Sequence, residues 1–249
     1  MDKFFTKKQK RNPGLKSRSV ESKLRKKKTK QPVGIVIGTY GSLPYVHLHL
    51  AVRKKFFPSV PLLVHDDCSS GKRLQELCKR YKCSFMTNEK RLGHIFGDLS
   101  VFADGLRWAE LMNIEILIKL SRRWIFRVDY VSDLMKLVKK EKCATYSNRT
   151  ATCGFGFRTD CIGMEVKRWV PYYSHIWRTI NSGSFGYDVV ERYFHLLAMA
   201  IDPKGFVAWP LMGQDWGTKS DNYLWYRANS IGDYRKFAKS MGVEYKIGW

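Results

Sequence analysis

Apolar runs alternate with amphipathic segments through the first half of the chain. Strands are expected where the chain is continuously apolar or rich in strand formers, at residues 33–38, 62–64, 83–87 and 114–120. Apolar positions at helical spacing predict helices between these strands, at residues 45–56, 72–81 and 98–112. Strands that alternate with helices in this order predict a mostly parallel α/β sheet flanked by helices.

The second half has a less regular pattern. Helices are expected at residues 133–140, 188–201 and 233–241, and short strand-like runs between residues 143 and 165. The sequence contains no internal repeat. It is therefore expected to form one folded domain, residues 32–249, preceded by an arm, residues 1–31.

The arm carries a disproportionate share of the positive charge. The formal net charge of the chain is +23, and residues 1–31 hold 13 Lys or Arg against Asp2 and Glu21. With so little apolar surface to bury, the arm is expected to be disordered. Such blocks bind polyanions, so nucleic acid is expected to contact Lys7, Lys8, Lys10, Arg11, Arg25, Lys26, Lys27 and Lys28. A solubilising or targeting tail is the alternative.

Other signals are absent. No apolar run is long enough for a transmembrane helix, and no apolar segment follows the basic N-terminus, so a cytoplasmic protein is expected. The 6 cysteines lack the spacing of a disulfide scaffold or a zinc site, and reduced thiols are expected. His47 and His49 are expected to be structural. The sequence does not indicate an oligomeric state.

Four segments in order resemble the nucleotide-sugar glycosyltransferases of the GT-A type, most closely family two. They are residues 35–41, 62–70, 97–109 and 115–123, so the resemblance covers roughly residues 33–125. The second segment, with Asp66 and Asp67, is similar to the family's strand ending in Val-Asp-Asp-Gly-Ser. The resemblance implies a GT-A-like fold and a nucleotide-sugar donor, with UDP-sugars favoured.

Ligands of open parallel sheets bind beyond the carboxyl ends of the strands. The resemblance implies that the second-strand carboxylate, Asp66 or Asp67, accepts hydrogen bonds from the nucleoside of the donor. A turn with a helix N-cap is the structural alternative for that segment. The full set of residues expected to bind the donor is Thr39, Tyr40, Asp66, Asp67, Gly97, Lys119 and Ser121.

The chain departs from the family where an Asp-x-Asp metal motif is expected. Ser121-Arg122-Arg123 stands there instead, so no carboxylate pair is left to hold Mg²⁺ or Mn²⁺. Arginine pairs with phosphate oxygens, so Arg122 and Arg123, with Lys119, are expected to stabilise the leaving nucleotide without a metal or other cofactor. The alternatives are a decayed site that only binds, or metal contacts from Asp129 or Asp133.

A catalytic base is expected in the second half if the reaction inverts the sugar configuration. Asp215 lies in a glycine-flanked loop beside Trp216, which is a candidate for stacking on a sugar or base. Asp221 and Glu191 are the next candidates. Glu191 also fits a purely structural role, because acids favour the first turn of a helix.

The acceptor is less constrained. Because a neutral glycan needs no excess of positive charge, a nucleic-acid acceptor is expected, such as a hydroxymethylated base in DNA. Viruses and phages contain enzymes of that general kind. One alternative is a transferase that builds a glycan or polysaccharide. An alternative of another class is a non-catalytic nucleic-acid-binding protein on the same fold.

Overall fold

A computed structural model describes residues 31–41, 43–69, 72–147, 158–187, 189–212 and 219–243. A seven-stranded sheet with strand order β3-β2-β1-β4-β7-β6-β8 forms its centre. The strands are β1 (Gln31–Thr39), β2 (Leu62–Asp66), β3 (Ser84–Thr87), β4 (Ile114–Ser121), β6 (Thr145–Ser147), β7 (Cys161–Glu165) and β8 (Val207–Ala208). Residues 1–30, Asp188, Asp215 and Trp216 lie outside the described residues.

The half of the sheet from β3 to β4 is parallel. In its register Ile35 pairs with Leu62 of β2 and with Ile118 of β4. Both faces of β1, β2 and β4 are buried, which explains their continuous apolar runs, whereas the edge strand β3 is only half-buried. Their carboxyl ends therefore meet at one edge of the sheet.

Strand β7 runs in the opposite direction. It pairs antiparallel with β4, where Ile118 lies opposite Gly163, and antiparallel with β6 on its other side. Because β7 is reversed, the residues that precede it, 158–160, arrive at the edge where β1 and β4 end. The mixed sheet confirms the expected mostly parallel α/β architecture.

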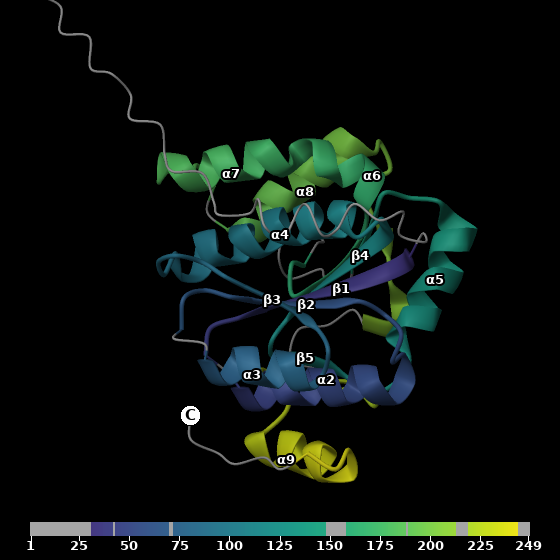
Figure 1. Ribbon diagram of the computed structural model, residues 1–249. Helices are drawn as coiled ribbons and strands as arrows, with labels where there is room; N and C mark the ends of the chain where they lie inside the picture. The colour runs from purple at the N-terminus through teal and green to yellow at the C-terminus, as the bar shows by residue number, and fades with distance from the viewer. Residues whose placement is uncertain are drawn as a thin grey trace, which may run out of the picture.

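Helices cover both faces of the sheet (Figure 1). On one face lie α4 (Gly93–Leu111), α6 (Val166–Trp169), α7 (Tyr173–Ser182) and α8 (Val190–Ile201), with the 3-10 helix η1 (Val170–Tyr172) between α6 and α7. On the other face lie α2 (Leu43–Phe56) and α3 (Lys72–Arg80). Helix α4 approaches β1 closely, because a Cβ on Gly105 would lie 2.9 Å from Cγ1 of Val36. The buried residues accordingly form one apolar cluster on each face.

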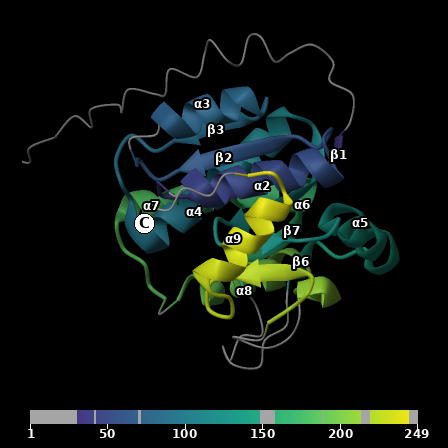
Figure 2. The same cartoon turned by 90° about the horizontal axis from the view of Figure 1, so that it is seen from below.

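A two-stranded antiparallel ribbon packs into the apolar cluster on the side of the sheet that α2 covers. It consists of β5 (Trp124–Phe126) and β9 (Tyr223–Trp225). Aromatic rings pack it from within, with Trp124 stacked on Tyr223 at a centroid distance of 4.6 Å. Figure 2 shows α9 (Ile231–Ser240) near α2, and α5 (Tyr130–Glu141) at the side of the sheet. The 3-10 helix η2 (Pro210–Met212) follows β8.

The predicted elements of the first half are confirmed within a few residues, with one correction. The helix expected at residues 98–112 begins at Gly93. It starts early because a carboxylate from another element, Asp67, accepts hydrogen bonds from the backbone N–H groups of Leu92 and Gly93. In the second half, the pattern did not predict α6, α7 or the ribbon.

All five described cysteines, Cys68, Cys78, Cys83, Cys143 and Cys161, are free thiols. None of the described helices has the length and apolar character that crossing a bilayer requires. Trp209 and Trp225 are core residues, 1% and 2% exposed.

Candidate active site

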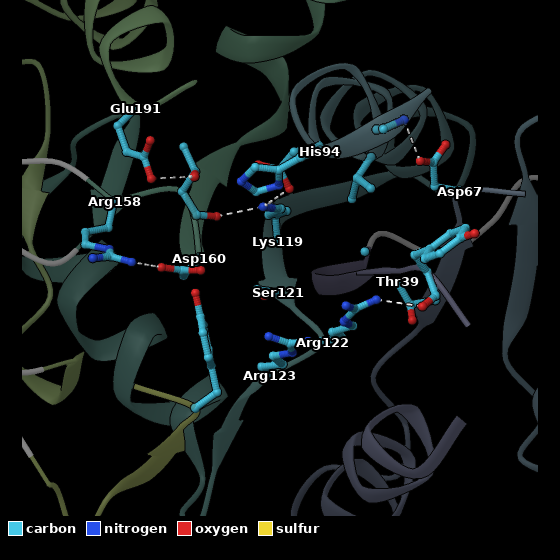
Figure 3. A pocket seen from close by; sticks show the side chains of 18 of the residues that line it. Thr39, Asp67, His94, Lys119, Ser121, Arg122, Arg123, Arg158, Asp160 and Glu191 are labelled. Carbon is cyan, nitrogen blue, oxygen red and sulfur yellow. Dashed lines mark hydrogen bonds and ion pairs between the residues drawn. The ribbon is translucent and has the colours of Figure 1, made fainter. Parts of the chain in front are cut away.

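A cavity of about 710 Å³ opens at the edge of the sheet where β1 and β4 end. Figure 3 shows Thr39 and Asp67 on one side of it, Glu191, Arg158 and Asp160 on the other, and Lys119 between them. Its lining also includes Tyr40, Arg91, His94, Gly97, Asp98, Ser121, Arg122, Arg123, Thr159, Tyr226 and Arg227. This is where open α/β sheets bind ligands.

Asp66 and Asp67 follow one another at the end of β2 but have different positions. Asp66 is fully buried and does not line the cavity; its carboxylate accepts hydrogen bonds from N and Oγ of Ser69, at 2.7 and 2.6 Å. The backbone N of Gly41 donates a third bond to Asp66, at 3.3 Å. Asp66 thus ties the turn after β1 to the turn after β2.

Asp67 lines the cavity and caps α4. Its carboxylate accepts hydrogen bonds of 2.9 Å from the backbone N of Leu92 and of Gly93, and one of 2.8 Å from Nδ2 of Asn88. An anion at a helix N-terminus is favoured by the macrodipole. A Cβ on Gly97 would lie only 2.8 Å from Oδ2 of Asp67, so the glycine permits this close approach.

Lys119 forms an ion pair with Asp98 on the floor of the cavity. It is 1% exposed, and its Nζ donates to Oδ1 of Asp98 at 2.5 Å and to the carbonyl O of Thr159 at 2.7 Å. The ammonium also lies 4.7 Å from the ring centroid of Phe102. A buried lysine needs such partners, and the bond to Thr159 connects β4 with the segment before β7.

Arg122 is held in place by β1, by the turn that follows β1 and by α2. Its backbone N donates to the carbonyl O of Gly38 at 3.1 Å, and its Nη1 donates to the carbonyl O of Tyr40 at 2.6 Å. Its own carbonyl O accepts a bond of 3.1 Å from Nε2 of His49 on α2. Burial lowers the pKa of Arg122, and the charge of Arg123 lowers it further, but an arginine stays protonated at neutral pH.

His49 is a neutral hydrogen-bond donor in this structure. Burial lowers the pKa of His49 to about 4, opposed by its backbone contacts with Arg122 and Ser121. Because a carbonyl oxygen only accepts, Nε2 of the neutral ring must carry the proton. The structural role expected for His49 is therefore to hold the turn formed by Arg122 and Arg123 after β4, called the arginine turn below.

Arg123 points to the opposite side from Arg122. Its guanidinium carbon lies 4.8 Å from the ring centroid of Tyr226, which follows β9, and Arg227 lies 5.6 Å from the same ring. The carbonyl O of Arg123 accepts a hydrogen bond of 2.5 Å from the hydroxyl of Tyr234 on α9. The two adjacent arginines therefore serve different walls of the cavity.

Three residues before β7 and one from α8 complete the far wall. Arg158 is buried, forms an ion pair with Asp160 and stacks at 4.9 Å on the ring of Trp225. Glu191, in the first turn of α8, accepts a hydrogen bond of 3.3 Å from Oγ1 of Thr159. Asp98 and Asp160 are each paired with a cation, and Asp67 with backbone N–H groups. Among the described residues, Glu191 accepts a hydrogen bond only from the Thr159 hydroxyl.

The residues at the expected metal position do not fit a divalent cation. Ser121, Arg122 and Arg123 supply a hydroxyl and two cations, whereas Mg²⁺ and Mn²⁺ need several oxygen ligands. Asp129 caps α5 by accepting from the backbone N of Ser132, and Asp133 accepts from Nε1 of Trp209. Neither lines the cavity. Within the described ranges, no three His, Cys, Asp or Glu side chains gather as metal ligands.

Gly97 and seven other residues expected to bind the donor or its diphosphate line this cavity. The seven are Thr39, Tyr40, Asp67, Lys119, Ser121, Arg122 and Arg123. Asp66 lies behind it, and Asp221 is exposed and does not line it. Asp215 and the cationic arm fall outside the described residues, so their roles stay predictions. Sequence reasoning missed Arg91, His94, Asp98, Arg158, Asp160, Tyr226 and Arg227; only Asp98 had a signal, because a lysine within an apolar strand requires a partner.

The fold is similar to that of a solved glycosyltransferase structure. The chain is similar to the glycosyltransferase GlyE of Streptococcus pneumoniae TIGR4, with a TM-score of 0.52 and 10% identity, over 74% of this chain and 47% of that one. It is also similar to S. aureus TarS 1–349, with a TM-score of 0.44 and 14% identity, over 56% of this chain and 48% of that one. For mouse xyloside xylosyltransferase 1 the TM-score is 0.45 and the identity 12%, over 84% and 93% of the two chains.

The chain thus spans about half the length of the GlyE and TarS chains. At these identities the likeness to GlyE shows the fold alone. No protein-family model matches the sequence, and no curated protein matches it.

Proposed function

We propose that the protein is a glycosyltransferase that takes a sugar from a nucleotide-sugar donor, with UDP-sugars favoured. The observation that carries the proposal is the cavity at the carboxyl ends of β1 and β4, which is lined by the residues expected from the sequence to bind the donor, except Asp66. The glycosyltransferase fold of GlyE supports it. Thr39, Tyr40 and Asp67 form the wall for the nucleoside.

The reaction is a displacement at the anomeric carbon of the sugar. The acceptor hydroxyl gives its proton to a carboxylate, and its oxygen forms a bond to the anomeric carbon. The bond between that carbon and the β-phosphate oxygen breaks, and its electron pair leaves with the nucleoside diphosphate. The protein must therefore supply a base and must stabilise the negative charge that grows on the diphosphate.

The arginine turn fits the second requirement. Arg122 and Arg123 line the cavity at the end of β4, and the contacts to Gly38, Tyr40 and His49 hold the turn before a donor arrives. Preorganised cations of this kind stabilise a leaving phosphate with little reorganisation. We propose that they do so without a divalent metal.

Glu191 fits the requirement for a base. It lines the cavity on the wall opposite Thr39 and Asp67, and its one hydrogen bond within the described ranges, from the Thr159 hydroxyl, leaves acceptor capacity on its carboxylate. Asp215, which the sequence favours for this role, lies outside the described residues. Both are therefore tested together.

The acceptor that fits the charge is nucleic acid, such as a hydroxymethylated base in DNA. The net charge of +23 includes many cations outside the cavity, which a neutral glycan acceptor would not need. A base within a duplex must turn out of the stack to reach this cavity. A glycan acceptor or non-catalytic nucleic-acid binding are the other outcomes of the tests.

The deciding experiment is a screen of nucleotide-sugars by thermal shift, followed by release of nucleoside diphosphate with EDTA or with added Mn²⁺. We expect a UDP-sugar to raise Tm, and turnover that withstands EDTA. Strict dependence on Mn²⁺ would overturn the role of the arginine turn. No shift and no release with any nucleotide-sugar would overturn the enzyme assignment.

A further inference from the structure

Two tyrosines flank the cavity, and each stacks with arginine. Tyr40, after β1, is 40% exposed, and its ring centroid lies 4.2 Å from the guanidinium carbon of Arg91. Tyr226, after β9, is also 40% exposed, and its ring centroid lies 4.8 Å from the guanidinium carbon of Arg123 and 5.6 Å from that of Arg227. Because the nucleoside of the donor is assigned to the wall with Tyr40, the wall with Tyr226 is left for a second ligand.

The ribbon of β5 and β9 builds the second wall. Its register pairs Trp124 with Trp225, so the residues just outside the ribbon, Arg123 and Tyr226, come together at one end. Buried aromatic rings fix that register, because Trp124 lies 5.5 Å from Trp225 and 4.6 Å from Tyr223. The contact between Arg123 and Tyr226 is therefore built into the fold.

The second wall also faces the group proposed to deprotonate the acceptor. Tyr226 lines the same cavity as Glu191 and the pair of Arg158 and Asp160. Arg158 stacks on Trp225, the buried residue before Tyr226, so the core of the ribbon also positions this cation. An exposed ring beside guanidinium groups offers a flat surface for a base and positive charge for a phosphate.

We propose that Tyr226, with Arg227, forms a second subsite that binds one nucleotide unit of the acceptor, the base on the tyrosine ring and its phosphate on Arg227, while Arg123 beside the ring keeps its role at the diphosphate of the donor. This rests on the proposed function, because it places the acceptor on the wall opposite the donor. The shared chemistry is a planar base joined to a phosphodiester. Such a unit comes either from a single strand or from a base turned out of a duplex.

The test compares the binding of three ligands to tyrosine variants of the full chain. Fluorescence anisotropy would follow a single-stranded oligodeoxynucleotide, its duplex, and a labelled heparin, which is a polyanion without bases. We expect Tyr226→Ala to weaken oligonucleotide binding by about tenfold, the effect of one lost base stack. Tyr226→Trp should retain binding, and heparin should lose much less affinity than the oligonucleotide.

A crossed measurement separates the two walls. Tyr40→Ala should weaken UDP-sugar binding more than oligonucleotide binding, and Tyr226→Ala should do the reverse. Tyr172→Ala, in η1 and outside the cavity lining, is the matched control. If Tyr226→Ala weakens binding of the single strand but not of the duplex, the subsite takes single strands. If it weakens binding of both equally, the subsite takes a base turned out of the duplex.

Three results would overturn the subsite. They are unchanged oligonucleotide affinity in Tyr226→Ala, an equal loss of heparin affinity, and an equal effect of Tyr40→Ala on oligonucleotide binding. The proposed function fails separately, if no nucleotide-sugar binds. Oligonucleotide binding through Tyr226 without any nucleotide-sugar binding would keep the subsite and leave a non-catalytic binder.

Discussion

Arg122 and Tyr40 are 82 residues apart in sequence, and Nη1 of Arg122 donates a 2.6 Å hydrogen bond to the carbonyl O of Tyr40. The bond connects the turn after β4 to the turn after β1. It fixes the direction of the guanidinium group and uses only part of its donor capacity. The remaining N–H groups can bind a phosphate in the cavity.

Replacement of Arg122 tests its electrostatic role. Arg122→Ala should lower kcat/KM for sugar transfer by a factor of about 10² to 10³, the usual effect of removing one preorganised donor to a developing anion. Arg122→Lys should recover part of the rate, because it keeps the charge but not the planar fork. Release of nucleoside diphosphate measures both. Arg178→Ala, on the exposed surface of α7, is the charge-matched control, and an equal loss there would contradict the prediction.

Glu191→Gln distinguishes a base from a structural acid. The amide can still accept the hydroxyl bond from Thr159 but cannot take a proton, so kcat for transfer should fall by about 10² to 10⁴. The effect should be larger on kcat than on KM for the donor. Asp215→Asn and Asp221→Asn are measured beside it. A full loss in Asp215→Asn with normal kcat in Glu191→Gln would assign the base to Asp215.

Gly97→Ala tests the close approach of Asp67 to α4. The added Cβ would lie 2.8 Å from Oδ2 and 3.0 Å from Cγ of Asp67, a carboxylate already held by backbone N–H groups. We expect the free energy of unfolding to fall by about 1–3 kcal/mol, as in other overpacked sites. Gly186→Ala, which meets no atom within 4 Å, is the control for thermal unfolding. Equal Tm values for the two variants would show that Asp67 moves aside freely.

Stability should decrease in acid through His49. Burial lowers the pKa of His49 from 6.5 to about 4, so between these values the unfolded chain binds more protons than the folded one. The free energy of unfolding should therefore fall as pH falls through this window, by at most about 3 kcal/mol from this residue. His49→Gln keeps a donor for the carbonyl of Arg122, and urea unfolding should then depend less on pH. An unchanged dependence would exclude His49 as its source.

The first half of the fold could be predicted because its strands are buried on both faces. The run from Val33 to Gly38 is apolar without a break, which suits a strand buried on both faces, as in a parallel sheet. The ribbon could not be predicted in the same way. Trp124 and Trp225 stabilise it by pairing across about one hundred residues, and strands this short carry little local pattern.

The candidate site divides along the same line. Thr39, Tyr40 and Asp67 follow strands that were predicted, so their convergence follows from strand order. Tyr226 and Asp160 belong to segments whose direction depends on tertiary pairing, and one sequence gives no sign of it. Asp66 shows a further limit, because two adjacent acids look alike until one is found buried against Ser69.

The reversed strand β7 makes the two walls of the cavity separable along the chain. The residues of the proposed donor wall all precede β5, and those of the proposed acceptor wall, apart from Arg123, all follow residue 157. Changes in the second set can therefore alter which hydroxyl is presented while leaving the nucleotide end intact. Exchanging only the cavity-lining residues after residue 157, while the strand pairings of β7 and β9 are kept, should therefore change acceptor choice without a change of donor.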